Sequence, residues 1–70
     1  MKIAVINPKS SYKVSITPRN LSIYDMRMHH VQFKTIAKIY GISNSRAQQI
    51  FNRMSELYKR GHFHYEDHEE

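Results

Sequence analysis

The sequence of 70 residues contains no cysteine and no long apolar run, and each absence excludes a class of protein. Without cysteine, neither a disulfide framework nor a thiolate metal site can form. No apolar run approaches the roughly 18 residues of a membrane span, and the N-terminus lacks the layout of a signal peptide. We therefore expect a soluble, cytoplasmic protein without a membrane partner.

The sequence also lacks the residue patterns that catalysis needs. Its length makes one small domain, too short for a deep pocket or a two-domain active site. No glycine-rich phosphate loop is present, and no nucleophile, base and orienting group stand in a recognisable pattern. We predict that the protein is not an enzyme and that it holds no cofactor and no metal.

Acidic residues are scarce over most of the chain. Residues 1–61 hold all 11 Lys and Arg but only the two acids Asp25 and Glu56, a net charge of +9. Residues 62–70 hold four acids and carry −4. A basic body is typical of nucleic-acid binders, because each phosphate that it neutralises releases counterions. Small basic domains also bind other proteins, so charge alone does not decide the partner.

Two short β-prone runs, residues 2–6 and 12–16, are separated by turn-forming residues and predict an N-terminal β-hairpin. In the second run, Tyr12, Val14 and Ile16 would share one face by alternation. A hairpin alone is marginal in water. It must cover the core as a lid, pair with another chain as a dimer edge or touch DNA as a wing, and the sequence leaves these roles open.

Thr17 and Pro18 mark the start of a helix, because Thr caps the first turn and Pro fits the first helical position. We expect this helix to run to about His29. Its apolar residues have a blurred period. One stripe contains Leu21, Tyr24 and Met28, with Ile23 and Met26 beside it. The buried side of this helix therefore stays open.

The stretch from Phe33 to Asn52 predicts two short helices joined by a tight turn. Gly41 favours the left-handed backbone of a helix C-cap, and Ser43 supplies a side-chain oxygen that caps the next helix. A small residue at Ala37 lets the two helices cross closely, as a helix-turn-helix requires. The apolar side of the second helix consists of Ala47, Ile50, Phe51, Met54, Leu57 and Tyr58.

The last residues, 62–70, are acidic and rich in histidine, and a terminal segment of this kind is expected to be unanchored. Phe63 and Tyr65 can instead pack back on the domain. His62, His64 and His68 with the nearby acids are an alternative ligand set for a divalent metal, although we predict none. The carboxylates of this tail can also compete with DNA for the basic body.

Several short motifs between Ile16 and Arg60 follow a known pattern. They are Ile16-Thr17-Pro18-Arg19 at the helix start, Ile36-Ala37, Gly41-Ile42-Ser43 at the turn, and Arg46, Gln49 and Ile50 after it. With these motifs the chain resembles region 4 of bacterial sigma factors and, equally, the output domains of quorum-sensing-type response regulators. The resemblance implies a helix-turn-helix that binds DNA. Gln32 departs from the pattern, because such domains usually carry Ser or Thr as the N-cap there.

The helix that starts at Ser43 has a polar side opposite its apolar side. Gln and Asn side chains can bond adenine in the major groove, and Ser can bond several bases. The predicted base-contacting residues are Ser45, Gln48, Gln49 and Asn52. The predicted phosphate-binding residues are Lys34, Lys38, Arg46, Arg53 and Arg60. For the two lysines, a purely solvated role stays open.

We predict a mainly α fold of three to four helices in a single domain, residues 1–61, with the hairpin over 1–16, the helix-turn-helix bundle over 17–61 and the tail over 62–70. The predicted function is sequence-specific binding of double-stranded DNA in bacterial or bacteriophage transcription regulation. The alternative is a small protein that binds RNA polymerase or a sigma factor through a sigma-like surface. A structural module of a recombinase or packaging complex is a third interpretation, and a homodimer is an option for any of them.

Overall fold

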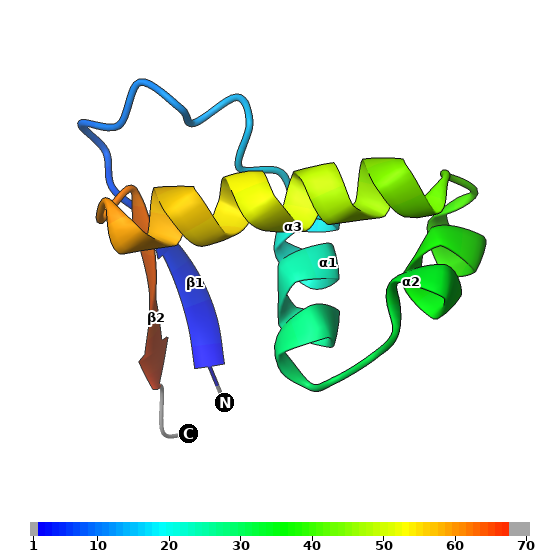
Figure 1. Cartoon of the computed structure of the whole chain (residues 1–70). Helices are drawn as coiled ribbons and strands as arrows, with labels where there is room; N and C mark the ends of the chain where they lie inside the picture. Colours follow the sequence, from blue (N-terminus) through cyan, green and yellow to red (C-terminus); the bar gives the residue numbers. More distant parts are fainter. Residues whose placement is uncertain (1, 68–70) are drawn as a thin grey trace.

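The computed structural model describes residues 2–67 and shows a mainly helical domain, as predicted, with three helices and one two-stranded antiparallel sheet in the described range. In chain order the elements are β1 (Lys2–Ile6), α1 (Pro18–Met28), α2 (Phe33–Tyr40), α3 (Asn44–Lys59) and β2 (Phe63–Asp67). The longest helix, α3, lies across α1, with α2 near its first turn and the sheet near its last (Figure 1). Helices α1 and α2 and strand β2 pack against this helix, and β1 pairs with β2.

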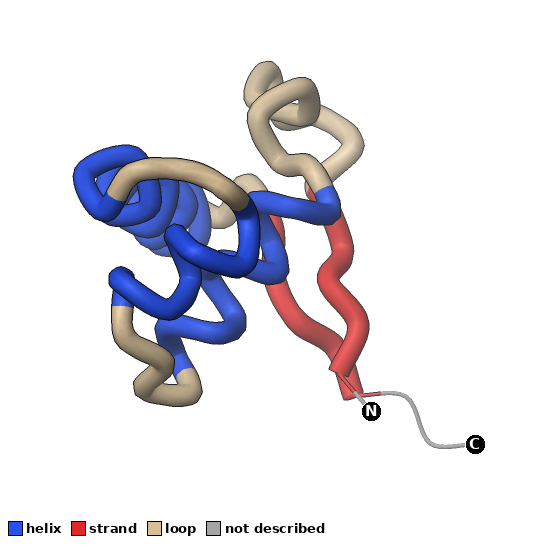
Figure 2. Tube along the Cα trace, turned by 90° about the vertical axis from the view of Figure 1, so that its right-hand side faces the viewer, coloured by secondary structure: helices blue, strands red, loops and turns tan. Residues whose placement is uncertain are grey.

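The N-terminal strand forms as predicted, but its partner comes from the other end of the chain. β1 pairs with β2 in an antiparallel register that sets Ile6 opposite Phe63, and Figure 2 shows the two strands side by side at one edge of the helices. The predicted second strand over residues 12–16 is therefore wrong. Residues 63–67 form a packed strand and not an unanchored tail, because Phe63 is completely buried.

Residues 12–16 form consecutive turns instead of a strand. The backbone N–H of Ser15 donates to the Tyr12 carbonyl oxygen at 3.0 Å, and that of Ile16 donates to the Lys13 carbonyl oxygen at 3.3 Å. Val14 is 89% exposed whereas Ile16 is buried, so the apolar residues of this run do not share a face. Pairing β1 with β2 buries an aromatic side chain that a local hairpin would leave in water, and this burial favours the long-range partner.

Helix α1 begins as its sequence predicts. The Thr17 side chain accepts a hydrogen bond from the Asn20 backbone N–H at 3.2 Å, with Pro18 in the first helical position. The buried side of the helix is formed by Ile23 and Tyr24. Met28, which belongs to the apolar stripe predicted from the sequence, is 56% exposed at the helix end. The structure thus shows that the side with Ile23 and Tyr24 is buried, which the irregular spacing of the apolar residues did not predict.

The turn between α2 and α3 has the predicted capping chemistry. Gly41 adopts a left-handed backbone with φ of 65°, and the Ile42 N–H donates to the Ala37 carbonyl oxygen at 2.9 Å. The Ser43 side chain accepts from the Arg46 N–H at 3.1 Å and so caps α3. The Gln32 side chain makes no capping hydrogen bond to α2. The helix-turn-helix geometry is therefore set at its turn.

One core joins the helices to the sheet. Its buried apolar residues are Ile16, Ile23, Tyr24, Ile36, Ala37, Ala47, Ile50, Met54, Leu57 and Phe63. All of the predicted apolar side of α3 is buried or half-buried except Tyr58, which is 42% exposed. No described helix combines the length and apolarity that crossing a bilayer would demand.

Candidate nucleic-acid interface

The exposed side of α3 carries the residues predicted to contact bases. Ala47 and Ile50 turn toward the core and anchor the helix. The side chains on the other faces are in solvent: Ser45, Gln48, Gln49 and Asn52 are all exposed. None of them is needed for packing, so their amides and hydroxyl are free to bond an external partner.

A polar groove brings three arginines together beside this helix. It has a volume of about 540 Å³ and runs along α3 toward the loop before α1 and the first turn of α1. Its lining residues are Val14, Ser15, Thr17, Arg19, Asn20, Arg46, Gln49, Ile50 and Arg53. Predicted base and phosphate contacts, Gln49 with Arg46 and Arg53, therefore share one concave surface. None of the described residues that line it is acidic.

Arg19 and Val14 line this groove although neither is among the predicted DNA contacts. Arg19 stands in the first turn of α1, and Val14 stands at the tip of the preceding turns. The signal for Arg19 in the sequence is weak, because the Ile-Thr-Pro-Arg motif that contains it predicts only the start of a helix. Val14 gave no signal, because an apolar residue in an alternating run is expected to be buried.

The loop that carries Val14 is held at both ends by hydrogen bonds. The Asn20 side-chain amide donates to the Ser15 carbonyl oxygen at 2.8 Å and ties the loop to α1. At the other end, the Tyr12 N–H donates to the Ser10 hydroxyl at 3.0 Å, and that hydroxyl lies 2.8 Å from Nδ1 of His62. These hydrogen bonds hold the loop beside α3.

The remaining predicted phosphate contacts lie outside the groove. Lys34 and Lys38 are exposed on α2, and neither lines it. Arg60 follows the end of α3, where its guanidinium donates to the Glu56 carboxylate at 2.7 Å. An exposed pair of this kind is weak, so it can open, but it lowers the local positive charge. Arg46 and Arg53 are the better-placed cations.

The histidines do not form a metal site in the described part of the chain. No group of three or more His, Cys, Asp and Glu side chains converges among residues 2–67. His62 bonds Ser10 and packs edge-on against the Tyr12 ring at 4.8 Å between centroids. His64 lies 2.9 Å from the Glu66 carboxylate on the exposed side of β2. His68, the third candidate ligand, lies outside the described residues.

Comparisons with known proteins find no matching family model, no matching curated protein and no matching solved structure. The resemblance to sigma region 4 and to response-regulator output domains thus stays a prediction.

Proposed function

We propose that this protein binds double-stranded DNA in a sequence-specific manner, with α3 as the recognition helix, and acts in transcription regulation in a bacterium or a bacteriophage. The observation that supports it best is the groove in which Gln49 lies with Arg19, Arg46 and Arg53 and with no acidic residue among its described lining. Amides suited to base edges and cations suited to phosphates occur together on one surface.

The dimensions of the two partners agree with this proposal. An α-helix with its side chains is about 10–12 Å across, and the major groove of B-DNA is about 12 Å wide. In a helix-turn-helix the N-terminal part of the second helix contacts base edges. Ser45, Gln48 and Gln49 occupy that part of α3 and are exposed. Asn52 lies one turn further along the helix.

The loop before α1 extends the proposed contact surface. Arg19 can bond a phosphate at the edge of the DNA major groove, and the exposed Val14 side chain can pack on a thymine methyl group. Of the three roles that the sequence left open for this region, a wing that touches DNA agrees best with the position of residues 13–15. The role would belong to a turn and not to the predicted second strand.

A salt titration of duplex binding tests the proposal. The full chain is titrated against a random duplex and against duplexes enriched by selection, at several salt concentrations. We expect affinity to fall steeply with salt on both, because phosphate contacts release counterions, and to be about a thousandfold or more higher on the selected site. A steep slope without preference would leave only non-specific binding and overturn sequence recognition.

The alternative, binding to RNA polymerase or a sigma factor, predicts a different outcome of the same experiment. The chain would then show no duplex binding at moderate salt and would co-purify with polymerase. Substituting Gln49 or Arg53 would weaken that association, because the exposed side of α3 would be the protein interface. This pair of results would replace the DNA-binding proposal.

A further inference from the structure

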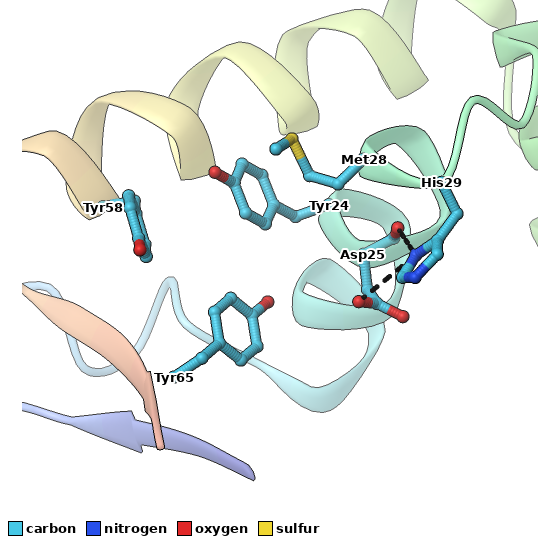
Figure 3. Close-up of a pocket in the computed structure, with 6 residues that line it drawn as sticks. All are labelled: Tyr24, Asp25, Met28, His29, Tyr58 and Tyr65. Atoms are coloured by element: carbon cyan, nitrogen blue, oxygen red, sulfur yellow. Dashed lines mark hydrogen bonds and ion pairs between the residues drawn. The ribbon is translucent and has the colours of Figure 1, made fainter. Parts of the chain in front are cut away.

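A second concave surface lies between α1, α3 and β2. It shares no lining residue with the polar groove that contains the three arginines. This aromatic pocket has a volume of about 380 Å³, within the range of about 300–1,000 Å³ that is common for small-ligand sites. Its lining residues are Tyr24, Asp25, Met28, His29, Tyr58 and Tyr65 (Figure 3). Nothing in the proposed DNA contact uses these side chains.

Three tyrosine rings from three different elements converge in the pocket. Tyr24 belongs to α1, Tyr58 to α3 and Tyr65 to β2, and their ring centroids are 6.0 to 6.4 Å apart. Tyr24 is buried and forms the inner wall, whereas Tyr58 is exposed at the rim. Aromatic rings carry negative charge on their faces, so a cluster of three attracts cations.

The rim of the pocket adds a formal negative charge. Asp25, one of only two acids in residues 1–61, is the single carboxylate among the described lining residues, and no Lys or Arg is among them. The His29 ring lies beside it, with Nδ1 2.8 Å from the Asp25 carbonyl oxygen and 3.6 Å from its carboxylate. In a protein with a basic body, this pocket is a local site that favours positive charge.

The supply of hydrogen-bond acceptors limits which cation suits the pocket. A primary ammonium carries three N–H donors that must be satisfied when it leaves water, whereas the one carboxylate among the described lining residues is Asp25, beside tyrosine hydroxyls and the His29 ring. A trimethylated ammonium has no N–H donor to satisfy and costs less to desolvate. The Tyr65 hydroxyl is buried and has no hydrogen-bond partner among the described residues, so Tyr65 offers the pocket its ring and not its hydroxyl.

We propose that the pocket formed by Tyr24, Tyr58, Tyr65 and Asp25 binds a methylated ammonium group. The rings contact the methyl groups, and the Asp25 carboxylate neutralises the charge. The same chemistry has two sources, a free quaternary ammonium compound of about the size of choline or the methylated lysine side chain of a partner protein. The inference is independent of DNA binding, because the two surfaces share no lining residue.

Nuclear magnetic resonance titration of the full chain tests the proposal with choline and two matched compounds. One is the uncharged isostere, in which a tert-butyl group replaces the trimethylammonium group, and the other is ethanolamine. We expect choline to shift the ring signals of Tyr24, Tyr58 and Tyr65 and to bind about three- to thirtyfold more tightly than the isostere. A peptide with trimethyl-lysine, compared with its unmodified form, distinguishes a protein source from a free ligand.

Variants assign the effect to the pocket. Asp25→Asn and Tyr58→Leu should each weaken choline or trimethyl-lysine binding several-fold, since the first removes the carboxylate and the second keeps apolar volume without the aromatic face. Glu56→Gln removes the other carboxylate of residues 1–61, which does not line the pocket, and should leave binding unchanged. Equal binding of the isostere, equal binding of ethanolamine, or the absence of ring shifts with both choline and the peptide would overturn the proposal.

Discussion

At the scale of single residues, the proposed DNA binding assigns two kinds of contact to the exposed side of α3. Gln49 carries an amide that can both donate to and accept from a base edge, whereas Arg53 carries a fixed positive charge that any phosphate can satisfy. Both are exposed and line the same groove. Because neither belongs to the core, their substitution tests binding without disturbing the fold.

For Gln49→Ala, we expect a loss of about 1–3 kcal/mol on the preferred duplex and a weaker preference at one base pair. For Arg53→Ala, we expect similar weakening on all duplexes and a salt slope reduced by about one unit. Binding isotherms on selected and random duplexes at several salt concentrations measure both effects. If the two variants lost affinity in the same way, the assignment of Gln49 to a base contact and of Arg53 to a phosphate contact would be wrong.

The tyrosines of the aromatic pocket make a residue-scale prediction about pH. Burial, followed by the nearby Asp25 carboxylate and the other two pocket tyrosines, raises the pKa of Tyr65 to about 12. The unfolded chain therefore releases this proton first, near the ordinary pKa of 10.0. The stability that the protonated Tyr65 hydroxyl contributes should be fully present below a pH of about 10. It should be lost as the pH rises from about 10 to about 12.

Urea unfolding midpoints over this range measure that loss of stability. The Tyr65→Phe variant has no ionisable hydroxyl at this position, so its midpoint should fall less steeply above a pH of about 10. A native midpoint that stays level up to a pH of about 12 would contradict the burial of this hydroxyl.

At the scale of elements, the helix-turn-helix depends on close packing of α2 and α3. Ala37 on α2 and Ala47 on α3 are both buried, and the turn between the two helices is closed by Gly41. Small side chains at these positions let the helices approach, and the approach sets the angle at which α3 is presented. The geometry of the proposed DNA-binding surface is therefore sensitive to the volume of the side chains in the core.

Ala37→Leu should overpack this junction and destabilise the protein by about 1–3 kcal/mol. Thermal unfolding followed by circular dichroism would show a lower melting temperature. Lys38→Leu is a matched control, because its side chain is exposed on the same helix and should change stability little. An unchanged melting temperature for Ala37→Leu would place that residue outside the packed junction.

The strand β2 makes a second prediction at the element scale. Phe63 is completely buried and contacts the Tyr24 and Tyr58 rings at 5.9 and 5.4 Å between centroids. Phe63→Ala should cost about 3–5 kcal/mol, a large part of the total stability of a domain of this size. Chemical denaturation measures the loss. His64→Ala, at the exposed neighbouring position, should cost much less, and equal losses would mean that β2 is not packed as a strand.

At the scale of the whole molecule, charge is divided between a basic body and an acidic C-terminal segment. Residues 1–61 carry +9 and residues 62–70 carry −4. Removing residues 63–70 would also remove Phe63 from the core, so truncation cannot isolate the electrostatic effect. Neutralising acids that lie beyond β2 avoids this problem.

Glu69→Gln together with Glu70→Gln removes two negative charges and raises the net charge from +5 to +7. Affinity for a random duplex should increase, because the variant has two fewer negative charges to repel the phosphates. The increase should be largest at low salt, since salt screens this repulsion. Binding at low and high salt measures the change. Unchanged affinity at low salt would show that these acids do not compete with DNA.

The sequence by itself determined the features that depend on neighbouring residues. Thr17 and Ser43 cap helices through side-chain bonds to N–H groups three residues ahead, and Gly41 ends α2 in a left-handed backbone. These interactions close within one helical turn, so the residue types suffice to predict them. The polar side of α3 followed in the same way from the helical period.

Only the tertiary structure decided which distant segments meet. Residues 12–16 have the alternation of a strand, yet β1 pairs with residues 63–67, because that pairing buries Phe63. The same long-range packing places Arg19 and Arg53 in the lining of one groove and gathers Tyr24, Tyr58 and Tyr65 into one pocket. Local patterns give each segment its own preference, but the choice of partner depends on how much apolar surface every competing arrangement buries.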